Sequence, residues 1–160
     1  MANYKHKINL KDLLKEGEKI AVSDKKEAAD RISKRAIELI KEDLQRYRSP
    51  VNGTPFKQLK DKDYQKLKGT KKSNLFLEGD LYAGLSEKSS SRGATLEIKG
   101  AINKLKAENH LKLDNDGNEI ERAAESKTGV SQRKFFPVGE ERLRAGILKK
   151  LREEIEDLIK

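Results

Sequence analysis

The feature that most constrains this chain is an amphipathic stretch at its C-terminal end. Apolar residues recur there at helical spacing over about five turns, and the stripe comprises Leu143, Ile147, Leu148, Leu151, Ile155, Leu158 and Ile159. Pro137 is unsuited to a helix interior, and Glu140 and Glu141 favour the positive end of a helix dipole. The pattern predicts a helix over about residues 140 to 159. Its last turn should be weak, because acidic residues crowd that end.

A second amphipathic stretch begins at Ser23 and Asp24. Asp24 is a suitable N-cap, and Glu27 three residues later completes a pattern like a capping box. One face then carries Ala28, Ile32, Ala36, Leu39, Ile40, Leu44 and Tyr47. Pro50 stops the run, so the pattern predicts a long helix of about six turns over about residues 24 to 48.

The segments between the two helices favour a small antiparallel sheet. Residues 75 to 85 alternate in places as a strand does, and the turn at 89 to 93 leads into a second alternating run at 95 to 98, which together predict a β-hairpin. Residues 101 to 113 fit a short helix that runs into a strand. We therefore predict one α+β domain over residues 1 to 160, with both long helices packed on the antiparallel sheet.

Two segments are less regular than the rest. Residues 1 to 22 hold a short apolar pattern broken by Gly17, which fits a short helix, a loop or a strand. We expect an extended N-terminal arm there, of a kind that is often ordered only on a partner. Residues 114 to 131 begin with a turn at 114 to 118 and continue with polar residues, so we expect a long loop excursion that is mobile.

The amino-acid composition indicates what kind of partner to expect. The apolar fraction is 34%, enough for a modest core, so some apolar surface is expected to be buried against a partner. The formal net charge of +9 favours an acidic partner such as nucleic acid or an acidic protein face, although such a charge can also serve solubility alone.

Several classes of protein are disfavoured. The chain has no cysteine, which excludes disulfides and cysteine-based zinc sites. No apolar run follows the basic N-terminus, and eighteen consecutive apolar residues occur nowhere, so we expect a soluble protein without a secretory signal or a membrane-spanning helix.

Lysines are concentrated after the turn-forming residues 51 to 56. The candidates for contact with a polyanion or a neighbouring subunit are Lys57, Lys60, Lys66, Lys68, Lys71 and Lys72. Phe56, Leu59 and Tyr64 are interleaved with them, as in proteins that stack bases along a positive groove. The alternative is a solvated loop with its few apolar side chains tucked underneath.

Residues for catalysis or metal binding do not form a known pattern. His6 and His110 are the only imidazoles, and neither has a catalytic partner at a familiar spacing. Asp114, Asp116 and Asn118 are spaced as in a calcium loop, and Glu125 stands at the twelfth position, but the glycine that such a loop needs is replaced by Glu119. A plain turn is favoured, and we expect no enzyme activity, no metal and no cofactor.

Three motifs occur in order along the chain. The first is Gly53-Thr54-Pro55-Phe56 followed by Leu59, Tyr64 and Lys66, the second is Leu77-Glu78-Gly79-Asp80-Leu81, and the third is Arg133-Lys134-Phe135-Phe136 before the C-terminal helix. Over about residues 30 to 158 the chain resembles the phage virion-morphogenesis family of tail-completion and head-to-tail-joining proteins. It departs from the family's aromatic-Ala-x-x-His-x-x-Gly stretch, of which Ala107 and His110 remain.

The resemblance implies a structural virion protein of a tailed bacteriophage, assembled in the host bacterial cytoplasm and located at the head-tail junction. Such a subunit would form a homo-oligomeric ring, a hexamer or dodecamer, as a neck, tail-completion or tail-terminator protein that joins the capsid connector to the tail. Its partners would be portal or adaptor and tail-tube proteins, with the passing genomic DNA as a further candidate contact.

The motif residues would then be scaffold rather than reagents, namely Gly53, Pro55, Phe56, Leu59, Gly79, Leu81, Arg133, Phe135 and Phe136. Gly79 would permit a tight turn into a strand at Leu81, and Phe135 and Phe136 would anchor the chain before the final helix. The alternative function, which follows from the net charge of +9 and from the lysines interleaved with aromatic residues, is a basic nucleic-acid-binding accessory protein.

Overall fold

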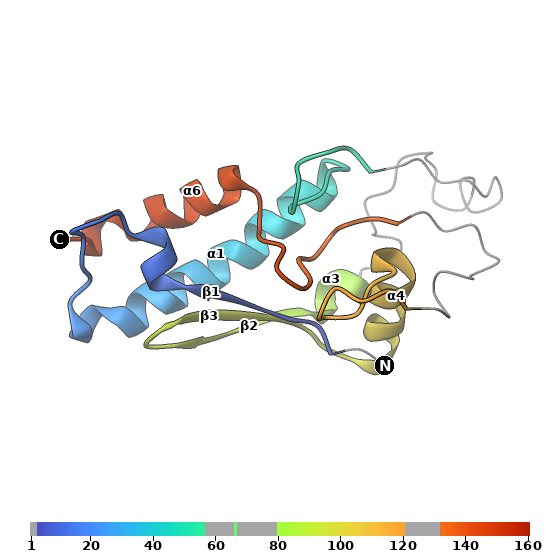
Figure 1. Ribbon diagram of the computed structural model, residues 1–160, viewed down its shortest axis with the longest axis horizontal. Helices are drawn as coiled ribbons and strands as arrows, with labels where there is room; N and C mark the ends of the chain where they lie inside the picture. The colour runs from blue at the N-terminus through green and yellow to red at the C-terminus, as the bar shows by residue number, and fades with distance from the viewer. Residues whose placement is uncertain (1–2, 57–65, 67–79, 121–131) are drawn as a thin grey trace.

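A three-stranded antiparallel sheet in the order β1-β3-β2 forms one layer of the fold (Figure 1). The computed structural model describes residues 3–56, 66, 80–120 and 132–160. The strands are β1 (Lys5–Asn9), β2 (Leu85–Ser90) and β3 (Gly93–Ile98). β2 and β3 form the predicted hairpin, with the turn at 91 to 92. At Gly93 a side chain is excluded, because a Cβ would collide with the Ile8 carbonyl oxygen of the neighbouring strand.

Of the predicted N-terminal arm, the described residues lie against the rest of the fold. β1 pairs with β3, and Tyr4 and Ile8 turn their side chains into the core. The chain continues through the 3₁₀ turn η1 (Leu10–Leu13), which buries Leu10 and Leu13. The sequence alone did not distinguish a strand from a helix or a loop here, because in β1 and directly before it only Ile8 and Tyr4 are large apolar residues.

Helix α1 (Lys25–Gln45) lies between the sheet and the C-terminal helix (Figure 1). It ends three residues before the predicted end, and Tyr47 has a positive φ of 60°. The capping box is wrong: the Asp24 side chain makes no capping hydrogen bond, since the 3₁₀ turn η2 (Val22–Asp24) precedes the helix. Glu27 instead pairs with Arg31 at 2.7 Å.

Helix α6 (Ala145–Ile155) packs its predicted apolar stripe on α1 and η1. It begins about five residues later than predicted, because Glu141 accepts a hydrogen bond from the backbone N–H of Val138 rather than lying in a first helical turn. The final turn tightens into the 3₁₀ helix η3 (Glu156–Leu158), as the weak last turn had suggested.

Two shorter helices occur between the long helices in sequence, α3 (Asp80–Gly84) and α4 (Ala101–Leu111). The strand predicted from residue 75 is wrong for residues 80 to 84, which are helical, so Leu81 does not begin a strand. Gly84 sits where a Cβ would be only 2.9 Å from the Lys99 carbonyl oxygen. The Lys99 backbone therefore leaves no room for a side chain at Gly84, where α3 ends and β2 begins.

The predicted excursion after α4 begins as expected. Leu113 forms an isolated bridge with Glu119, and the Asp114 carboxylate accepts backbone hydrogen bonds from Asp116 and Asn118, both at 2.9 Å. Asn115 holds this turn to Lys5 and Gly139 through hydrogen bonds of 2.9 and 2.8 Å. The rest of the segment predicted to be mobile, residues 121 to 131, lies outside the described residues.

One hydrophobic cluster joins these elements. It contains buried side chains from the sheet, both long helices, α4 and the segment before α6, and Tyr4, Phe135 and Phe136 are among its largest members. The α+β class, with a small antiparallel sheet and two long helices, is therefore confirmed, but of these two helices only α1 packs directly on the sheet, and α6 packs on α1 and η1. Within the described ranges, no helix is long and apolar enough to cross a membrane.

Candidate functional site

The first and third sequence motifs meet in space. The Ser49 hydroxyl donates a hydrogen bond to the Lys134 carbonyl oxygen, across 85 positions of sequence. Phe135 and Phe136 are fully buried, and Phe56 is partly buried against the same core. Pro55 bridges to Arg48, which closes the loop that carries the first motif. Phe135 and Phe136 therefore lie in the core before α6, and the loop that holds the first motif is joined to the segment that holds the third.

A buried carboxylate holds this unit together. Asp43, near the end of α1, is 1% exposed and accepts hydrogen bonds from Arg48 Nε at 2.8 Å, Arg144 Nε at 2.7 Å and Arg144 Nη2 at 2.9 Å. We call these three residues the Asp43 cluster. The hydrogen bond to Asp43 raises the pKa of the Arg144 guanidinium above its ordinary value. The cluster thereby ties the end of α1 to the start of α6.

The loop that carries Gly53 is fitted against this cluster. Gly53 has a positive φ of 74°, and a Cβ there would lie 3.5 Å from the Arg144 side chain. The backbone N–H of Arg144 donates a hydrogen bond to the Pro50 carbonyl oxygen at 2.8 Å. Glycine at this position is therefore explained by backbone conformation, which agrees with a scaffold role.

The basic doublet of the third motif is not an exposed binding element. Arg133 is buried, and its backbone N–H donates to the His110 carbonyl at 2.7 Å. Lys134 pairs with Glu141 at 2.6 Å. The His110 ring meets Phe135 edge-on, with centroids 6.4 Å apart, which is a packing contact.

The comparisons with known proteins were made on the whole chain. No protein-family model, curated protein or solved structure matches it. Its function is therefore inferred from its own residues.

Most of the predicted lysine cluster lies outside the described residues. Only Lys66 is described, and it is exposed in a helical conformation. Lys57, Lys60, Lys68, Lys71 and Lys72 lie outside the described residues, as do Leu59 and Gly79. Their roles stay predictions.

The structure reveals a second basic surface, which we call the outer sheet face. Side chains alternate along a strand, and since Tyr4, Ile8, Leu96 and Ile98 point into the core, the residues between them point to the opposite face. That face carries Lys5, Lys7, Lys88, Thr95 and Glu97. Lys88 Nζ lies 3.4 Å from Glu97 Oε1. The residues named on this surface therefore include three lysines and one acidic residue. The sequence missed this surface because β1 was not recognised as a strand.

His6 lies on β1. Burial, assisted by the positive charge of Arg142, lowers the pKa of its imidazole from 6.5 to about 4. The ring is therefore neutral at neutral pH. In the part of the chain that the structure describes, no group of three or more His, Asp or Glu residues is placed to hold a metal ion.

Proposed function

We propose that this protein is a structural subunit of a tailed bacteriophage, which forms a homo-oligomeric ring at the head-tail junction and joins the capsid connector to the tail. The observation that carries the proposal is the packing of the loop that holds the first motif against the segment that holds the third: the Ser49 hydroxyl donates a hydrogen bond to the Lys134 carbonyl, and Phe56 packs against the core that contains Phe135 and Phe136. This packing supports a scaffold role for the motif residues, as the resemblance implies. The α+β architecture is also the one that the resemblance implies.

The distribution of exposed apolar residues supports a ring. Val22 is 82% exposed beside the start of α1, whereas Ile102 and Leu105 on α4 are 67% and 42% exposed. The start of α1 and α4 lie at opposite ends of the elongated molecule (Figure 1). Two different contact surfaces on one subunit are what a heterologous interface requires, and such interfaces form rings when the rotation between subunits closes.

This proposal is tested by the mass and shape of the purified protein, alone and mixed with the adaptor and tail-tube proteins of the same phage. We expect closed rings by light scattering and negative-stain microscopy in at least one of these samples. Ile102→Glu should weaken ring formation, while Lys149→Glu, an exposed change on α6, should not. A monomer in every mixture would contradict the proposal.

The outer sheet face favours a second candidate, a nucleic-acid-binding accessory protein. Lysines that contact phosphates release counterions, so binding should weaken steeply with salt. Replacing Lys5, Lys7 and Lys88 by glutamine should reduce the salt slope by about three units if each contacts one phosphate. A second variant neutralises Lys66, Lys68, Lys71 and Lys72, and Lys149→Gln with Lys150→Gln is the control. If duplex and single-strand binding are unchanged in both test variants, this candidate fails.

A further inference from the structure

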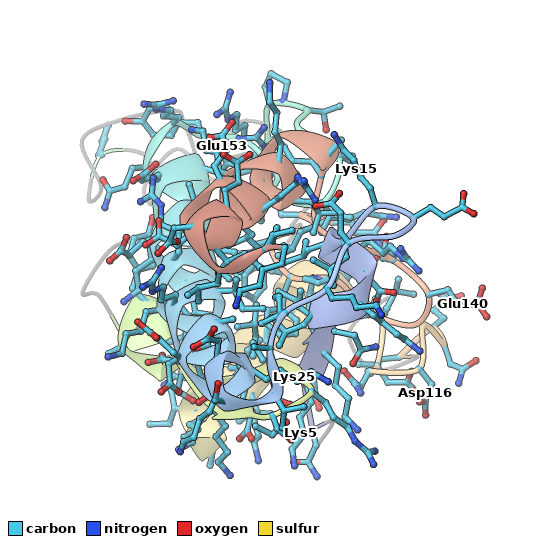
Figure 2. All side chains as sticks on the ribbon, turned by 90° about the vertical axis from the view of Figure 1, so that its left-hand side faces the viewer. Lys5, Lys15, Lys25, Asp116, Glu140 and Glu153 are labelled. Carbon is cyan, nitrogen blue, oxygen red and sulfur yellow. The ribbon has the colours of Figure 1, made fainter. Side chains whose placement is uncertain are left out.

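A groove of about 760 Å³ opens beside the start of α1. Figure 2 looks onto this end of the molecule, with Lys25 labelled. The groove, which we call the basic groove, lies between η1, the loop that follows it, and the β2–β3 turn. Its lining residues include Leu10, Lys11, Leu14, Glu18, Lys19, Ile20, Val22, Lys25 and Arg92.

The walls of the basic groove are fixed by backbone hydrogen bonds. Leu10 N–H donates to the Arg92 carbonyl at 2.9 Å, which joins η1 to the hairpin turn. Lys19 and Lys160 exchange two hydrogen bonds of 2.9 and 2.8 Å, which joins the loop to the C-terminal residues. A site held in this way loses little conformational entropy when a ligand binds.

Positive charge dominates the lining. Lys11, Lys19, Lys25 and Arg92 contribute four cations, and Glu18, the one acid among the described lining residues, is already engaged by Arg152 at 2.7 Å. The hydrogen bond from Arg152 also lowers the pKa of Glu18, so its carboxylate stays ionised and paired. The charge of the groove is therefore complementary to an acidic ligand.

The groove also presents apolar surface. Ile20 and Leu10 are buried beneath it, Leu14 is half-buried, and the side chain of Val22 is almost fully exposed at its edge. Among the residues that the structure describes, no aromatic side chain lines the groove, so these residues offer no platform on which nucleic-acid bases could stack. An occupant must bring both carboxylates and an apolar side chain.

We propose that the basic groove binds an acidic peptide segment of a partner protein. Carboxylates of that segment would contact Lys11, Lys19, Lys25 and Arg92, while an apolar side chain would cover Val22 and Leu14. The apolar lining and the absence of aromatic residues favour a peptide over a nucleic acid. This assignment rests on the groove alone, and because Val22 is also a proposed ring contact, the peptide and a neighbouring subunit would exclude each other at that residue.

The experiment measures fluorescence anisotropy of a short labelled peptide of aspartate, glutamate and leucine residues, titrated with the full-length protein. Lys19→Glu with Lys25→Glu should weaken binding about tenfold or more, since both charges are inverted at the contact. Val22→Ser should weaken it several-fold without disturbing the fold, because that side chain is exposed. Lys149→Glu with Lys150→Glu makes the same charge change on α6 and should leave the affinity unchanged.

Two further probes decide the class of ligand. A peptide with serine in place of leucine should bind more weakly, and oligothymidylate of the same charge should not compete at equal concentration. The proposal is overturned if the acidic peptide does not bind, if the groove variants bind it as the wild type does, or if either probe matches its affinity. Amide chemical-shift changes on addition of the peptide that occur only at residues outside the groove lining would overturn the proposal as well.

Discussion

At the scale of single residues, the most consequential finding is a carboxylate that no motif contains. Asp43 lies four residues after Leu39 and three after Ile40, on the apolar face of α1, where an unpaired charge would be costly. That position was a usable signal in the sequence. Its partner Arg144 lies 101 positions away, and no local pattern predicts such a pairing.

Asp43→Asn tests the cluster. The change keeps the shape of the side chain but removes its charge, leaving Arg48 and Arg144 without their counter-ion, so the free energy of unfolding should fall by about 3 kcal/mol. Urea denaturation measures it. Glu38→Gln is the control, because the Arg35–Glu38 pair is exposed and worth less than about 1 kcal/mol. Equal losses in both variants would show that Asp43 has no special role.

His6 gives the fold a pH dependence. Its pKa is about 4 in the folded chain and 6.5 when unperturbed, so between these values the unfolded chain binds more protons. Stability should therefore be fully present above about pH 6.5 and fall as the pH drops towards 4. In His6→Gln the loss between about pH 7 and pH 4 should be smaller than in the wild type, as measured by urea denaturation at each pH. An equal loss in both proteins would argue that the imidazole titrates normally.

At the scale of elements, the sequence predicted the parts with long periodic patterns. The stripes of α1 and α6 repeat over several turns, and the hairpin was recognised from its turn and its second strand, although its first strand is Leu85–Ser90 and not the run at 75 to 85. The sequence did not identify β1 as a strand, because only two large apolar residues, Tyr4 and Ile8, mark it. Residues 80 to 84 were wrongly assigned to a strand, because over so short a run Leu81 and Ala83 fit a strand or a helical turn equally well. The joining of the motifs depends on tertiary contacts and could not be predicted.

Hydrogen exchange tests whether β1 is a strand of the folded protein. Ile98 N–H donates to the Tyr4 carbonyl and Leu10 N–H to the Arg92 carbonyl, which sets the alternation between them. The amides of His6 and Ile8 therefore point at β3 and should be protected, whereas the amides of Lys7 and Asn9 point away and should exchange faster. Uniformly fast exchange from residue 4 to residue 10 would mean that this segment is an arm in solution.

At the scale of the whole molecule, charge and exposed apolar residues are distributed over separate surfaces. The outer sheet face is basic, the basic groove lies at the end where α1 begins, and exposed Ile102 and Leu105 lie on α4 at the opposite end. A subunit with several distinct surfaces is suited to simultaneous contacts with copies of itself and with other proteins. This arrangement is the structural basis of the proposed place in the phage neck.

If this protein is encoded by a phage, as proposed, the most direct test of that place is to inactivate its gene and to examine the lysate by electron microscopy. The proposed function predicts DNA-filled heads and tails that remain separate, and joined particles once the wild-type chain is supplied in trans. Intact virions in normal numbers from the inactivated phage would contradict it.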